Sequence, residues 1–325
     1  MIDLPPYSSK SESKIVYLDQ KCWINLAKIY YGNPTNSEKK ILGKIFNASD
    51  NGSAIFPISI YRFEETINRK NPRNREQLAS LMMKISKWYC FTPFYDRIVN
   101  GEVWNIILEK LNLPKIDLRE KVLGKGIGHL LGAKPEIHGD IPEDLRQELL
   151  DMIDEPETII KIISGFDSLY TDELNQNYRI AHNLLERNRQ KLRQIRDKEK
   201  RRKAFLGINF SAMITPKIAT ILHALQFPVN FIIKENFSER DFEDLLDKIP
   251  TALCLFTLIF QRDQEYHRPI KKNDFNDIAS LTLAIPYSDI VITDKMMASI
   301  ATRMKLDDKC DTIILKSISE LEEYL

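Results

Sequence analysis

The chain has 325 residues, 43% of them hydrophobic, which is enough apolar material for one large domain or two smaller ones. Its formal net charge of +1 excludes a molecule that is basic over its whole surface, so any contact with nucleic acid must come from a local patch. The widely spaced cysteines predict neither a zinc site nor a disulfide framework, and fit a reducing cytoplasm; they are Cys22, Cys90, Cys254 and Cys310.

The first hundred residues alternate between strand and helix patterns. Residues 1–13 are polar and lack the apolar run of a secretion signal. The apolar run 14–18 predicts a buried strand that ends at Asp19, and helical spacing follows it up to a stop near residue 32. Beyond it we expect a helix over 37–48, a strand over 54–58, a helix from residue 61, a helix over 75–88 and a short strand over 89–92.

Between residues 96 and 270 strand patterns become rare and amphipathic helical patterns dominate. Glycines and prolines over 124–142 indicate a loop, and 172–205 predicts one long polar helix. The most apolar helical stretch, 252–260, is too short to span a bilayer, so no membrane segment is expected.

The end of the chain returns to alternating helices and strands. We expect a helix over 274–284, a strand over 290–293 that ends at Asp294, a helix to about 304, a strand over 312–315 and a closing helix. Such alternation predicts an α/β fold with a central parallel sheet and helices on both faces. The simplest organisation is one domain built from 14–95 and 271–325, with a mainly α-helical insertion over 96–270.

Acidic residues follow the predicted strands at matching places. Asp19 and Asp294 come directly after a strand, and Glu64 and Glu65 begin the helix after the strand near residue 58. Because the carboxyl ends of parallel strands meet at one edge, these acids are expected to gather there. Asp277 joins them if its helix starts at that edge. Taken singly, each acid is better explained as a helix cap or turn residue.

Such a set of carboxylates would suit Mg²⁺ or Mn²⁺, which are hard cations that prefer oxygen ligands. Two such ions can clamp a scissile phosphodiester and activate a water molecule. The acids therefore indicate phosphodiester hydrolysis as the chemistry to test.

Four segments carry a further pattern. An apolar strand ends at Asp19, the run 57–65 contains a serine and helix-borne glutamates, Asp277 opens a helix of small residues, and a strand ends at Thr293-Asp294. Together these segments resemble a PIN-type nuclease domain. The resemblance covers about 14–95 and 271–325. It implies a three-layer α/β/α fold and metal-dependent ribonuclease activity. It also implies Asp19, Glu65 or Glu64, Asp277 and Asp294 as the Mg²⁺ or Mn²⁺ ligands, with Thr293 orienting a water or phosphate oxygen. The long insertion departs from the compact family pattern.

The same resemblance suggests an RNA substrate, with single-stranded DNA as the alternative. By analogy alone, the setting would be a bacterial toxin or antiphage-defence effector that is restrained by an antitoxin-like or regulatory protein and is able to form homo-oligomers.

A basic run supplies the main local positive charge. It could neutralise several phosphates, or equally be a solvent-facing helix or one that docks on an acidic partner protein. Its members are Arg187, Arg189, Lys191, Arg193, Arg196, Arg201 and Arg202.

Two alternatives to the metal-dependent enzyme stay open. Arg262 and His267 match the Arg-x4-His motif of HEPN-type ribonucleases, in which His acts as acid or base and Arg stabilises the phosphorane charge. Alternatively, the fold is catalytically silent and binds nucleic acid or protein.

Overall fold

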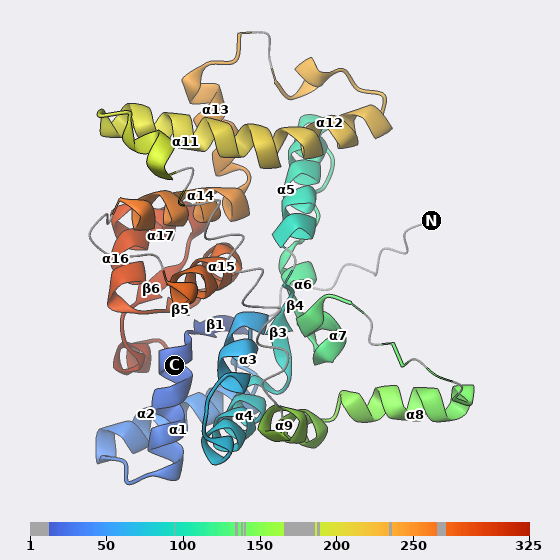
Figure 1. Ribbon diagram of the computed structural model, residues 1–325, viewed down its shortest axis with the longest axis vertical. Coiled ribbons are helices and arrows are strands. Elements are labelled where there is room, and N and C mark those ends of the chain that lie inside the picture. The colour runs from blue at the N-terminus through green and yellow to red at the C-terminus, as the bar shows by residue number, and fades with distance from the viewer. Residues whose placement is uncertain are drawn as a thin grey trace.

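The computed structural model describes residues 13–93, 95–133, 136–137, 139, 141–165, 186, 189–233, 236–264 and 271–325 (Figure 1). Its centre is a parallel sheet of four strands in the order β2-β1-β5-β6. The strands are β1 (Lys14–Leu18), β2 (Ala54–Ile55), β5 (Ile290–Ile292) and β6 (Ile313–Leu315). All of them come from the two ends of the chain, and the expected α/β class with a parallel sheet is confirmed.

Strand β1 lies inside the sheet because both of its faces are apolar. Ile15 and Tyr17 enter one core cluster, and Val16 and Leu18 enter the other. All four side chains are buried. The sheet is therefore covered by helices on both faces.

The cluster around Val16 and Leu18 is closed by helices from the N-terminal part, namely α1 (Gln20–Tyr31), α2 (Asn36–Asp50) and α4 (Pro72–Ser86). The opposite cluster is closed by α5 (Tyr95–Lys110), α14 (Pro250–Asp263), α15 (Lys272–Tyr287), α16 (Lys295–Arg303) and α17 (Leu306–Cys310). In Figure 1 the first group lies below the sheet, and α14 to α17 lie above it. Helices α5 and α14 belong to the expected insertion, so its described residues share a core with the sheet.

The remaining elements lie around this core or connect its helices. They are α3 (Ile60–Ile67), β3 (Tyr89–Phe91), α6 (Arg119–Val122), β4 (Leu123–Lys125), α7 (Gly126–Leu131), α8 (Glu143–Ile153), α9 (Pro156–Gly165), α11 (Lys198–Met213), α12 (Thr215–Ala224), η2 (Val229–Phe231), α13 (Glu239–Asp247) and η3 (Ile318–Glu323). Helices α11, α12 and α13 form the top of the molecule in Figure 1.

The buried carboxyl of Glu102 links the helical insertion to the core around the sheet. Oε1 of Glu102, on α5, accepts hydrogen bonds from the Thr251 backbone N–H at 3.0 Å and hydroxyl at 2.7 Å, on α14. The same oxygen accepts from the hydroxyl of Tyr287, on α15, at 2.7 Å. Burial raises the pKa of Glu102 to about 7, against the lowering effect of these hydrogen bonds.

The strand expected over 54–58 is shorter than predicted. Ordered pairing with β1 ends at Ile55, and Ile58 forms only an isolated bridge with Cys90 of β3. Pro57 lies between them and has no N–H to donate to a ladder, which accounts for the interruption.

The loop expected over 124–142 was a wrong prediction for its first part, which contains β4 and α7. Strand β4 pairs antiparallel with β3. Gly124 packs against the ring of His129, where a Cβ would lie 2.4 Å from Nδ1, and Gly126 has a φ of +87°. These glycines therefore allow a tight strand-to-helix connection rather than a loop.

The single long helix expected over 172–205 is also wrong in its described part. Residues 195–197 are not helical, and α11 begins after Asp197. The Asp197 side chain accepts a hydrogen bond from the Lys200 backbone N–H at 2.7 Å, so this residue caps a new helix. Residues 166–185 lie outside the described part of the chain.

One described stretch, Lys198–Ala224, is long and apolar enough to cross a membrane by length and composition. Of its most apolar window, 39% is buried within the molecule. Core helices of soluble proteins meet the same criterion, so this stretch is weak evidence for a membrane segment.

Candidate active site

Asp19 and Asp294 lie side by side at the carboxyl edge of the sheet. Leu18 of β1 is paired with Ile292 of β5, and the Asp19 backbone N–H donates to the Ile292 carbonyl at 3.0 Å. Each aspartate follows its strand and precedes a helix, α1 or α16. The parallel register therefore places two carboxylates at neighbouring strand ends, as expected.

Both aspartates are also helix caps. Oδ1 of Asp19 accepts from the Cys22 backbone N–H at 2.8 Å. Oδ1 of Asp294 accepts from the backbone N–H groups of Met296 at 2.6 Å and Met297 at 3.2 Å. Each aspartate is therefore both a helix cap and part of the acidic site, and the cap hydrogen bonds orient its carboxylate.

Glu65 and Asp277 are held together by Arg62. Arg62 lies one helical turn before Glu65 on α3, and its Nη1 lies 2.7 Å from Glu65 Oε2. Its Nη2 lies 2.9 Å from Oδ1 of Asp277, near the start of α15. One guanidinium therefore joins acids that are 212 positions apart in the sequence.

Arg62 is held rigidly. Only 2% of it is exposed. Its Nε donates to the Tyr17 hydroxyl at 3.2 Å, and its Nη2 donates to the Ser280 hydroxyl at 3.0 Å. Burial acts to lower the pKa of Arg62, but the charges of Tyr17, Glu65 and Asp277 raise it overall, so Arg62 remains a cation.

The four acids line one cavity of about 460 Å³. Burial raises the pKa of Asp277 to about 6; Arg62 opposes this shift, whereas Glu65 and Asp294 add to it. The other lining residues are Gln20, Lys21, Ile24, Arg62, Asn68, Arg69, Asn273 and Asn276.

Glu64 and Thr293 do not line this cavity. Thr293 is buried, and its backbone N–H donates to the Leu315 carbonyl at 3.1 Å, so it extends the pairing between β5 and β6. Of the two glutamates that the sequence left as alternatives, the geometry therefore favours Glu65.

Two further acids near the predicted site face elsewhere. Asp274 is buried and pairs with Arg262 at 2.8 Å. Asp289 accepts from the Ile15 backbone N–H and pairs with Arg119, at the opposite end of β5.

The donor set of the cavity fits a cation. Arg62 already occupies the position between Glu65 and Asp277 as a positive charge, and carboxylate and amide oxygens are the ligands that Mg²⁺ and Mn²⁺ prefer. In the arrangement observed, no three His, Cys, Asp or Glu side chains among the described residues converge as a ready metal-binding group. With Arg62 engaging two of the four acids, a metal ion would have to share them or reposition them.

Sequence reasoning missed the cations of the site, which are Arg62, Lys21 and Arg69. An arginine three positions before a helical glutamate is a pattern that favours an ion pair, so Arg62 could have been found. Its second partner, Asp277, is a tertiary contact that no local pattern contains.

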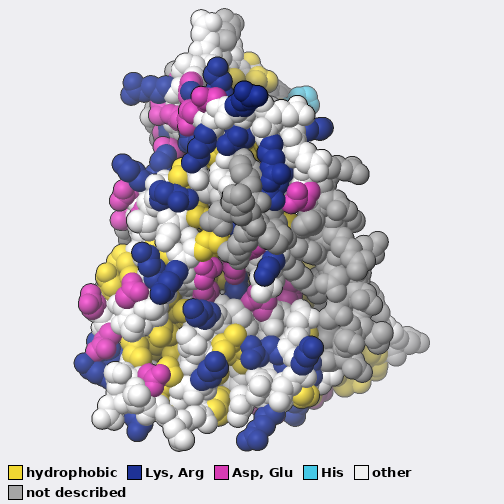
Figure 2. Space-filling model, turned by 60° about the vertical axis from the view of Figure 1, so that its left-hand side comes forward, with side chains coloured by type: hydrophobic (Ala, Val, Ile, Leu, Met, Phe, Trp, Pro, Cys, Tyr) yellow, Lys and Arg dark blue, Asp and Glu magenta, His cyan; other side chains and the backbone are white. Residues whose placement is uncertain are grey.

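Part of the basic run is engaged in ion pairs or hydrogen bonds where it is described. Arg189 is buried and pairs with Glu186 and Asp263, and Arg201 donates to Gln264. Arg202 pairs with Glu199 of α11 and Glu243 of α13. Figure 2 shows acidic side chains among the lysines and arginines over the upper part of this face, where α11 and α13 lie. Lys191, Arg193 and Arg196 are exposed, and Arg187 lies outside the described residues.

Only Arg262 of the alternative His/Arg motif lies in the described part of the chain. Arg262 is buried on α14 and pairs with Asp274. His267 lies outside the described residues.

Comparison with known proteins adds no relative. The chain matches no protein-family model, no curated protein and no solved structure. Function must therefore be argued from the site itself.

Proposed function

We propose that this chain is a divalent-metal-dependent endoribonuclease of PIN-like fold. The observation that carries the proposal is that Asp19, Glu65, Asp277 and Asp294 line the same cavity at the carboxyl edge of the sheet. Three separate parts of the chain supply these acids. Asp19 and Asp294 are helix caps, and Glu65 and Asp277 share one arginine. The four acids carry more negative charge than Arg62 alone balances, and a divalent cation would relieve the remaining repulsion.

The side chains of the cavity would have separate roles. Asp19, Glu65, Asp277 and Asp294 would hold Mg²⁺ or Mn²⁺, which supply Lewis-acid activation of water and phosphate. Arg62 fixes the Glu65 and Asp277 carboxylates, and the Asn276 side-chain amide donates to Glu65 at 3.5 Å. Lys21 and Arg69, at the wall of the cavity, would bind the phosphates that flank the scissile bond.

The test is cleavage of labelled RNA and single-stranded DNA oligonucleotides with Mn²⁺ or Mg²⁺, with and without EDTA. The variant is Asp19→Asn/Asp294→Asn. The matched control is Asp197→Asn/Asp311→Asn, which removes the same charge and also alters one helix cap. We expect RNA cleavage that EDTA abolishes and that falls at least about 100-fold in the first variant only. Cleavage that survives EDTA and the first variant would refute the proposal.

A second candidate is favoured by one observation. Because Arg62 already pairs with both Glu65 and Asp277, the site can be a purely structural ion cluster in a binding module without catalysis. In that case no cleavage appears under any metal condition, and Asp19→Asn/Asp294→Asn binds RNA as the wild type does. If the chain is the endoribonuclease of a toxin or defence system, a partner protein is expected to inhibit it. Adding that partner would then abolish RNA cleavage.

A further inference from the structure

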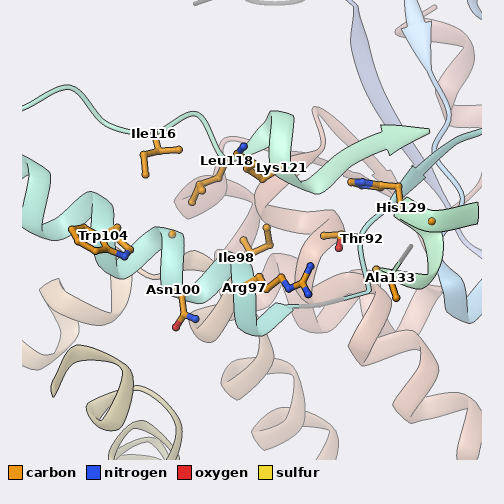
Figure 3. Close-up of a pocket in the computed structure, with 13 residues that line it drawn as sticks. Thr92, Arg97, Ile98, Asn100, Trp104, Ile116, Leu118, Lys121, His129 and Ala133 are labelled. Carbon is orange, nitrogen blue, oxygen red and sulfur yellow. The ribbon is translucent and has the colours of Figure 1, made fainter. Parts of the chain in front are cut away.

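A second, larger cavity of about 740 Å³ lies mainly in the helical insertion over 96–270. It lies between α5, the chain around residues 116–121 that leads into α6, and α7 (Figure 3). None of its lining residues lines the acidic cavity. Its size is that of pockets that enclose small organic ligands.

The charged groups of this cavity are basic. Arg97 and Lys121 line it and are exposed, and among its described lining residues none is aspartate or glutamate. Among the described lining residues, an anion that enters this cavity would meet hydrogen-bond donors and no carboxylate.

The cavity also has aromatic walls at its two ends. Figure 3 shows Trp104 at one end and His129 at the other, with Asn100, Arg97 and Lys121 between them. Nε2 of His129 donates to the Val122 carbonyl at 2.9 Å, and its Nδ1 packs against Gly124, so the ring is fixed as a flat surface. Trp104 is half-buried and keeps part of its indole accessible.

The cavity continues past Trp104. Asn100 and Trp104 also line an adjoining hollow of about 320 Å³ next to α12, together with Lys217 and Thr220. Lys217 pairs with Asp96 at 3.0 Å, so its charge is partly compensated. Trp104 therefore lines both the basic cavity and the adjoining hollow.

We infer that this cavity binds a nucleoside phosphate, with the base stacked on Trp104 and the phosphate held by Arg97 and Lys121. An indole face stacks on any base, guanidinium and ammonium groups bind phosphate, and the Asn100 amide is placed to bond a base edge. The nucleotide comes either free from solution or as a residue of an RNA strand. The inference does not depend on metal chemistry at the acidic cavity.

The experiment measures fluorescence polarisation of labelled ATP and of a labelled ten-nucleotide adenylate strand, in EDTA. It uses the full chain carrying Asp19→Asn/Asp294→Asn, so that cleavage cannot interfere. On that background we compare Arg97→Ala/Lys121→Ala, Trp104→Ala and Trp104→Phe. The charge-matched control is Lys39→Ala/Lys70→Ala, which changes two exposed lysines outside the cavity.

We expect Arg97→Ala/Lys121→Ala to weaken binding at least about ten-fold, because charge-assisted bonds are lost. Trp104→Ala should weaken it about ten-fold through lost stacking, and Trp104→Phe should restore most of it. Binding of ATP assigns the cavity to a free nucleotide, whereas binding of the strand alone assigns it to RNA. Absence of binding by both probes would overturn the inference, and so would equal binding by the cavity variants and the lysine control.

Arg97 and Lys121 are exposed side chains, so Arg97→Ala/Lys121→Ala decides the result if Trp104→Ala does not fold. If the wild-type chain cleaves no RNA but binding here is intact, the proposed function alone fails; if the wild-type chain cleaves RNA but no binding appears here, this inference alone fails.

Discussion

Arg62 and Arg262 are both buried arginines paired with carboxylates, one in the α/β region and one in the helical region. Arg262 and Asp274 are sealed from solvent, with side-chain exposures of 1% and 3%. Arg62 is equally buried, but its partners Glu65 and Asp277 are 16% and 23% exposed and line a cavity. A sealed pair can only support the fold, whereas a pair on a cavity wall leaves its acids open to a second cation.

The largest expected effect is at the sealed pair. Arg262→Met leaves the Asp274 carboxylate buried without its cation, so we expect the free energy of unfolding to fall by about 4 kcal/mol. Urea denaturation measures it, with exposed Arg303→Met as the control and an expected change below about 0.5 kcal/mol. Added Mn²⁺ should leave this loss of unfolding free energy unchanged. If Mn²⁺ restored the stability of Arg262→Met, the two arginines would not differ in the way described.

The next effect concerns the junction between the two regions. Glu102 has a pKa of about 7 in the fold, above its value in the unfolded chain. The stability that its neutral form contributes is therefore complete below about pH 4.5 and is lost as pH rises through about 7. We expect this loss to be on the order of 3 kcal/mol, and Glu102→Gln to remove that part of the pH dependence. Equal slopes for the two proteins between pH 5 and 8 would contradict it.

Arg62→Met should cost less than the sealed pair, about 2 to 3 kcal/mol, because its partners are partly solvated. Here Mn²⁺ should restore stability, since a metal ion can replace the lost cation; saturation near one hundred times its Kd is worth about 2.7 kcal/mol. Thermal unfolding with and without Mn²⁺ measures this. Adding Asp19→Asn/Asp294→Asn should abolish the recovery, and no recovery in the single variant would argue for a structural cluster.

The smallest effect separates capping from chemistry at Asp294. Asp294→Ala removes the acceptor for two backbone N–H groups and should cost about 1 kcal/mol, whereas Asp294→Asn keeps an acceptor and should cost almost nothing. Both variants should abolish cleavage. An active Asp294→Asn enzyme would show that its carboxylate serves as a cap alone.

The positions of Asp19 and Asp294 were predictable because each ends a short apolar run, and parallel strand ends must share an edge. Glu65 was predictable to within one residue. These features depend on local periodicity and on the general rules of parallel sheets.

Other features were not predictable for a physical reason. The partners of Arg62 and Glu102 lie up to 215 and 185 positions away and are selected by tertiary packing. Strand β4 was hidden because glycine suggests a loop, whereas Gly124 serves here to admit the His129 ring. The break before α11 depends on Asp197 acting as a cap within an otherwise helical, polar stretch.

The position of β1 inside the sheet has a consequence for how the chain is made. One neighbour, β2, follows within about 40 residues, but the other, β5, begins only at Ile290. At translation rates of about 5 to 20 residues per second, the ribosome needs roughly 10 to 50 s to travel from β2 to β5. During that time one edge of β1 has no partner strand, so the nascent chain exposes an apolar strand edge to aggregation or to chaperones.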